Sequence, residues 1–116
     1  MDKEAERRRH PRIHVRWPIT VFIDQRRIEG ETRNISVSGL FIRCDDALRR
    51  EESLLLSLRP QEGQEIWVKG KVAWSDSSRF NGTITKYSMG FSFVEISDRD
   101  KLLLEDLVSV LSETTT

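Results

Sequence analysis

Apolar and polar positions alternate with a period of two along residues 13–23. The apolar members of this series are Ile13, Val15, Trp17, Ile19, Val21 and Ile23. Such alternation, rich in β-branched residues, predicts a β-strand, and Pro18 restricts the strand to a sheet edge or a bulge. Asp24–Gln25 predicts a turn, after which Ile28, Thr32 and Ile35 mark a second strand.

The same kind of signal recurs further along the chain. Strands are predicted near residues 40–44, 54–58, 66–74 and 87–94. Gly70 is a candidate bulge within the third of these. The polar stretch Ser75–Gly82 is predicted to be a loop that separates the last two.

The end of the chain differs in kind. A helical spacing relates Leu103, Leu104, Leu107, Val108 and Leu111, and Ser97 and Asp98 offer N-cap oxygens ahead of them. The patterns together predict a mainly β protein with six or seven short antiparallel strands and one C-terminal helix. Regular short strands of this kind are typical of a barrel or a sandwich.

Length and composition agree with one small domain. The chain has 116 residues and a single cysteine, Cys44, which cannot form an internal disulfide. No apolar run approaches the ~20 residues that span a bilayer, and the charged start lacks the apolar region of a secretory signal. We therefore expect a cytoplasmic protein without membrane insertion, and Cys44 as a small buried hydrophobe.

The charges balance overall but are unevenly distributed. Nineteen basic and nineteen acidic side chains cancel, whereas residues 7–16 contain five arginines, two histidines and no acid. A protein that coats DNA or RNA usually carries a basic excess, because its affinity comes from many phosphate contacts. A local cluster on a neutral chain favours a small anionic ligand instead.

Two short motifs carry the candidate chemistry. The first, R-x-x-x-R, runs from Arg8 to Arg12 and is preceded by Arg7; the second, N-x-S-x-x-G, consists of Asn34, Ser36 and Gly39. Guanidinium groups pair bidentately with phosphates and with the O6/N7 edge of guanine, and they stack on flat rings. Asn34 and Ser36 are expected to face the same side of a strand. The two motifs suggest a ligand with phosphates and a purine.

The paired motifs, at this spacing on a β-rich chain, resemble the signature of PilZ domains. The resemblance extends to Lys71–Trp74, to the strand around Gly90 and to the closing helix, and it covers roughly residues 6–111. It implies a six-stranded antiparallel barrel with a C-terminal α-helix that binds cyclic di-GMP on its outer face. It also implies an arm at residues 1–12, a barrel with its helix at 13–112 and a tail at 113–116.

The resemblance also implies a role for each site residue. Arg8 and Arg12 would contact phosphates and guanine edges, and Asn34 and Ser36 would hydrogen-bond a guanine and the ribose-phosphate. Gly39 would let the ligand lie close. Trp74 matches a position where some members place an aromatic ring against a base, although packing in the core or on the barrel surface is an equal alternative for it.

The residue before R-x-x-x-R bears on stoichiometry in this family. An arginine there accompanies two stacked cyclic di-GMP molecules, so Arg7 favours two ligands, and Arg9 is expected to join the site. The arm has no apolar anchors and repels itself electrostatically, so we expect it to be mobile without ligand and ordered by binding. The rearranged surface would then signal to a downstream protein, which the sequence does not identify.

Other functions receive less support from the residues. No Ser, His and Asp arrangement, phosphate loop or metal-binding spacing is recognisable, so we expect neither an enzyme nor a cofactor. One alternative is a PilZ-like interaction module that has lost ligand binding, although both motifs are intact here. A second is a nucleic-acid-binding barrel, which the zero net charge disfavours; we therefore expect no DNA or RNA partner.

Overall fold

The computed structural model describes residues 11–46 and 53–114. These residues form six strands followed by one helix, which confirms the mainly β class. The elements are β1 (Pro18–Ile23), β2 (Arg26–Ile35), β3 (Gly39–Cys44), β4 (Ser53–Leu58), β5 (Ile66–Phe80), β6 (Thr83–Ile96) and α2 (Asp98–Thr114).

The strands close into an antiparallel barrel in the order β1-β2-β3-β6-β5-β4. The first and last strands of this order meet where Ile19 of β1 pairs with Leu58 of β4, so the sheet has no open edge there. A closed barrel removes the unpaired backbone groups that an edge strand would expose. The expected six-stranded barrel is therefore confirmed, and the alternative of a sandwich is excluded.

The barrel interior is filled by the alternating apolar positions that the sequence shows. In β5, for example, Ile66, Val68 and Val72 are buried while the residues between them, Gly70 apart, face outward. A register shift between Lys69 and Gly70 confirms the expected bulge. Side chains from all six strands and from the helix contribute to one core cluster. Period-two alternation thus correctly predicts the buried positions of β5 from Ile66 to Val72.

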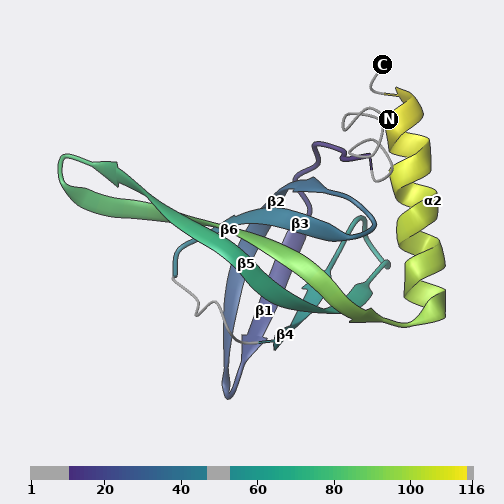
Figure 1. Ribbon diagram of the computed structural model, residues 1–116, viewed down its shortest axis with the longest axis horizontal. Helices are drawn as coiled ribbons and strands as arrows, with labels where there is room; N and C mark the ends of the chain where they lie inside the picture. The colour runs from purple at the N-terminus through teal and green to yellow at the C-terminus, as the bar shows by residue number, and fades with distance from the viewer. Residues whose placement is uncertain (1–10, 47–52, 115–116) are drawn as a thin grey trace, which may run out of the picture.

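Helix α2 stands beside the barrel and covers part of it (Figure 1). Leu104 and Val108 on its inner face belong to the core. Ser97 Oγ accepts a hydrogen bond from Asp100 N at 3.2 Å, as expected of an N-cap, and Asp100 Oδ2 accepts one from Trp67 N of β5 at 3.1 Å. The helix runs to Thr114, past the expected boundary at 112. No helix in the described part of the chain is long and apolar enough to cross a membrane.

The loop predicted at Ser75–Gly82 is wrong. Strands β5 and β6 instead continue as a long two-stranded hairpin that projects from the barrel, and only Asn81 and Gly82 form its turn (Figure 1). Both turn residues have positive φ, 52° and 80°, as a tight hairpin turn between twisted strands requires. The prediction failed because both faces of this ribbon lie mostly in solvent. Its sequence therefore lacks the alternation of apolar and polar residues that marks a half-buried strand.

The strand predicted to start at Ile13 is also wrong, since β1 begins at Pro18. Residues 13–17 are nevertheless fixed. Ile13 is buried and exchanges two backbone hydrogen bonds of 2.9 Å with Ile35 of β2. Trp17 N donates to Thr32 Oγ1 at 2.8 Å, and Thr32 N donates to Trp17 O at 2.9 Å. The segment between the arginine motif and the barrel is therefore anchored at both of its ends.

Candidate functional site

One row of side chains crosses four neighbouring strands on the outside of the barrel. Asn34 of β2 pairs with Phe41 of β3, Phe41 pairs with Gly90 of β6, and Gly90 pairs with Trp74 of β5. Residues directly opposite each other in a sheet share a face. Because Trp74 is 38% exposed, this row lies on the outer face. The structure thus places Asn34 and Trp74 at opposite ends of one surface row.

Arg12 joins the first motif to the second. Its Nη1 donates a hydrogen bond to Asn34 Oδ1 at 2.7 Å. The backbone allows this contact, because Ile13 and Ile35 form an antiparallel bridge and Arg12 and Asn34 then lie diagonally on one face, within reach of a long side chain. A cavity of about 300 Å³ opens at this point, lined by Arg12, Asn34, Phe41 and Trp74 among others.

Trp74 is directed outward by a β-bulge. Val72 is buried, and strict alternation would also turn Trp74 inward. A register shift between Val72 and Trp74 adds one residue to the strand, so the indole emerges on the outer face. The sequence did not show this bulge. Between the core and surface positions left open for Trp74, the structure shows the surface one.

Gly90 and Phe41 hold the indole in place. A Cβ atom on Gly90 would lie 2.1 Å from Trp74 Nε1 and 2.6 Å from its Cε2, so the ring rests directly on the glycine backbone. The Phe41 ring meets the indole edge-on, with centroids 4.8 Å apart and planes at 76°. Neither Gly90 nor Phe41 was predicted to belong to the site. Only their pairing with Trp74 across three strands reveals them.

Ser36 and Gly39 shape the turn between β2 and β3. Because β2 ends at Ile35, the expectation that Ser36 faces the same side as Asn34 does not apply to it. Ser36 is fully buried; its Oγ accepts from Ser38 N at 3.2 Å, and its own N–H donates to Gly39 O at 2.8 Å. A Cβ atom on Gly39 would lie 2.4 Å from Phe91 O, so the glycine lets β3 approach β6 closely. Ser36 and Gly39 therefore shape the turn that follows Asn34 and support the position of the Asn34 side chain.

The remaining residues expected in the site are Arg7, Arg8 and Arg9. They lie outside the described residues, as do positions 1–6 of the expected arm. The described site therefore contains Arg12, Asn34 and Trp74, with Phe41 and Gly90 beneath the indole. This set offers a cation for a phosphate or a guanine edge, an amide for hydrogen bonding, and a flat ring for stacking on a base.

Cys44 is a buried thiol whose surroundings disfavour its ionised form. Cys44 is buried as expected, its thiol donates to Asp46 O at 3.1 Å, and burial raises the pKa of the thiol. A raised pKa leaves little of the reactive thiolate at neutral pH. Within residues 11–46 and 53–114, no group of three or more His, Cys, Asp or Glu side chains could hold a metal ion.

Fold and site together define a small closed barrel with a polar, aromatic site on its outer face. The chain belongs to the PilZ domain family, whose model matches residues 6–109. An uncharacterised protein of Aquifex aeolicus (strain VF5) is 30% identical over 94 residues, which make up 81% of this chain and 44% of that protein. This chain therefore spans less than half the length of that relative.

Solved structures of PilZ-domain proteins share the fold. The Bacillus subtilis inhibitor of motility (MotI/DgrA) superimposes with a TM-score of 0.78 and 21% identity, over 95% of this chain and 53% of that one. The PilZ domain of YcgR from Escherichia coli, solved with c-di-GMP, gives a TM-score of 0.74 and 12% identity over 94% of both chains. At these identities the likeness concerns the fold.

Proposed function

We propose that this domain binds cyclic di-GMP on the outer face formed by β2, β3, β6 and β5, and that it acts as a receptor without catalysis. The observation that carries the proposal is the hydrogen bond from Arg12 to Asn34, at the end of the row that leads to Trp74. This bond joins one residue of each PilZ motif, and the row places both on the same surface as an exposed indole. The YcgR domain of the same fold was solved with this ligand.

Each residue has a role in the proposed complex. Arg12 pairs with a phosphate or with the O6/N7 edge of a guanine, and Trp74 stacks on a base. Asn34 hydrogen-bonds the ligand while orienting Arg12. Ser36 and Gly39 support Asn34 through the turn rather than by direct contact. Arg7, Arg8 and Arg9 bring additional positive charge from the preceding segment, which favours two stacked ligands.

The proposed output is a change of surface. Arg12 already contacts the barrel through Asn34; ligand phosphates neutralise the arginines that precede it and draw their segment onto the barrel, and a downstream protein recognises the altered face. The arm is connected to the barrel through Ile13, whose two backbone bonds to Ile35 provide a fixed point about which the preceding residues can reorient.

The test is calorimetric titration with cyclic di-GMP, with GTP as the control ligand. We expect the wild-type domain to bind and the Arg12→Ala variant to lose about tenfold to a hundredfold in affinity, because a charge-assisted pair is removed. Arg16→Ala is the matched control, since Arg16 is an exposed arginine of the same segment and is absent from the lining of the site. No binding by the wild type, or equal losses in both variants, would refute the proposal.

A further inference from the structure

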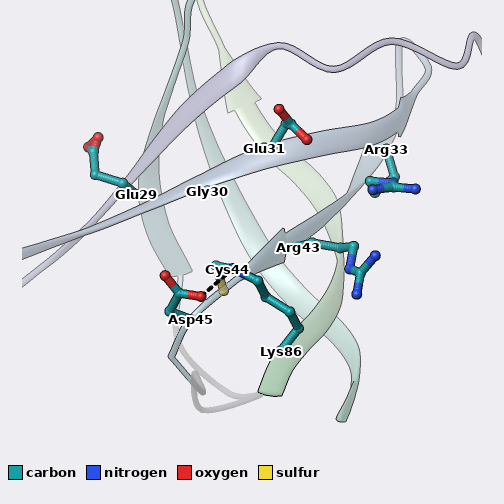
Figure 2. A pocket seen from close by; sticks show the side chains of 8 residues that line it. All are labelled: Glu29, Gly30, Glu31, Arg33, Arg43, Cys44, Asp45 and Lys86. Carbon is teal, nitrogen blue, oxygen red and sulfur yellow. Dashed lines mark hydrogen bonds and ion pairs between the residues drawn. The ribbon is translucent and has the colours of Figure 1, made fainter. Parts of the chain in front are cut away.

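A second concave surface lies beside the proposed ligand site. It encloses about 410 Å³ between strands β2, β3 and β6, and three cations line it: Arg33, Arg43 and Lys86. Both arginines line the same cavity, and Figure 2 shows their side chains extending to the same side of it. Neither arginine belongs to the two motifs that indicated the ligand site.

The backbone explains why both arginines adjoin that site. A register shift between Thr32 and Asn34 leaves Arg33 as the extra residue of a bulge, immediately before Asn34. Arg43 follows Phe41 by two positions on β3, so it lies on the same face, about 7 Å further along the strand. The cations therefore continue the outer surface that carries Asn34, Phe41 and Trp74.

Two of the three acidic residues that line this surface, Asp45 and Glu29, interact with groups other than Arg33 and Arg43. Lys86 is paired with Asp45. Glu29 accepts from Thr20 Oγ1 and lies 3.7 Å from Arg59 Nη2. Glu31 lies opposite Arg43 in the register of β2 and β3, and Figure 2 shows its carboxylate directed away from both guanidinium groups.

No hydrogen bond or ion pair joins Arg33 or Arg43 to another residue in the described ranges. Two cations that line one cavity repel each other, and an anion bound in the cavity would relieve that repulsion. A phosphate suits the geometry, because its oxygens match the fork of donors on a guanidinium group.

We propose that Arg33 and Arg43 form a phosphate-binding subsite that takes a phosphodiester of the bound cyclic dinucleotide. The subsite extends the face beyond Arg12, Asn34 and Trp74, and this inference rests on the proposed function. A ligand that stacks on Trp74 and extends toward Phe41 also reaches Arg43, which lies on the same face of β3. Trp74 then binds a base, whereas Arg33 and Arg43 bind a phosphate.

The experiment compares cyclic di-GMP binding by the wild type and by an Arg33→Ala/Arg43→Ala variant. We expect the double variant to bind about tenfold or more weakly, and its affinity to depend less steeply on salt, because fewer phosphate charges are neutralised. The matched control is Arg27→Ala/Arg99→Ala, which removes the same charge from exposed positions that do not line this cavity. Circular dichroism checks that each variant is folded. An Arg33→Lys/Arg43→Lys pair retains the charge and should recover part of the affinity.

Four outcomes separate the subsite from the proposed function. Weak binding by the double variant beside near-normal binding by the control supports the subsite. Unchanged binding by the double variant, with weakened binding by Arg12→Ala, overturns the subsite and leaves the proposed function standing. Equal losses in the double variant and its control also overturn the subsite, because only long-range charge would then be acting. No binding by the wild-type domain overturns both.

Discussion

Gly90 is a glycine because the Trp74 ring occupies the space that a side chain would need. The nearest heavy atoms to a Cβ built there all belong to the indole, at 2.1, 2.6 and 2.8 Å. No real Cβ contact is this short, so a larger residue at position 90 must displace the ring. Phe41 packs against the indole from another strand. At the scale of single residues, a glycine and a phenylalanine orient the side chain that is proposed to stack on the ligand.

This dependence predicts a strong coupling between positions 90 and 74. We expect Gly90→Ala to lower the free energy of unfolding by about 1–3 kcal/mol when Trp74 is present, since the added methyl overpacks the site. In a Trp74→Ala background the obstruction is gone, and the same substitution should have little effect. Urea unfolding of the wild type, the two single variants and the double variant measures the difference. Equal losses in both backgrounds would show that the glycine serves another purpose.

At the scale of elements, the β5–β6 hairpin consists of two regions that differ in burial. Its barrel half contributes buried residues such as Val68, Val72 and Phe91 to the core. Its distal half projects into solvent, with Phe80 69% exposed near the tip. A two-stranded ribbon without further packing is only marginally stable in water. The distal half should therefore open locally while the barrel remains folded.

The turn residue Gly82 provides a test of this division. Its φ is +80°, and an alanine there would carry an energetic cost of about 1–2 kcal/mol. We expect Gly82→Ala to accelerate amide hydrogen exchange at residues 78–84 by about 5-fold to 30-fold, with little change in the urea midpoint. Asn81→Gly is the control, because glycine also accepts the positive φ of that position. Comparable acceleration in β1 and β4 would mean that hairpin and barrel open together.

At the scale of the whole molecule, pairing between β1 and β4 turns a sheet into a barrel. Leu58 of β4 lies opposite Ile19 on one side and Ile66 on the other, and all three side chains are fully buried. The seam is therefore part of the core. Closure joins residues that are far apart in the chain, and we expect the barrel to unfold cooperatively as one unit.

Truncation at the seam should therefore lower the stability of the whole domain. We expect Leu58→Ala to reduce the free energy of unfolding by about 2–5 kcal/mol, because it leaves a cavity in a packed core. Leu55→Ala is the matched control on the same strand, since Leu55 is 43% exposed and its loss should have an effect within about 0.5 kcal/mol. Urea unfolding followed by tryptophan fluorescence and by circular dichroism checks both values. Transitions that differ between the two probes would contradict cooperative unfolding.

Several features could be predicted from the sequence because they are local. Period-two alternation identifies the core strands, and the spacing of Leu104 and Val108 identifies the helix that covers them. The motifs around Arg12 and Asn34 indicate the family, since both lie within short contiguous stretches. The predictions failed where this local signal was weak. The polar distal hairpin has no buried face, and residues 13–17 are held by pairs of hydrogen bonds to β2 at Ile13 and Trp17 rather than by a continuous ladder.

The sequence by itself thus determined the mainly β class, the helix, the family and the two motifs. Only the tertiary structure decided which side chains share the site. Bulges before Asn34 and Trp74 shift the register of their strands, so alternation alone assigns the wrong face to Trp74 and does not bring Phe41 or Gly90 beneath it. The physical reason is that cross-strand neighbours depend on the register of separate strands, a property that no single stretch of sequence contains.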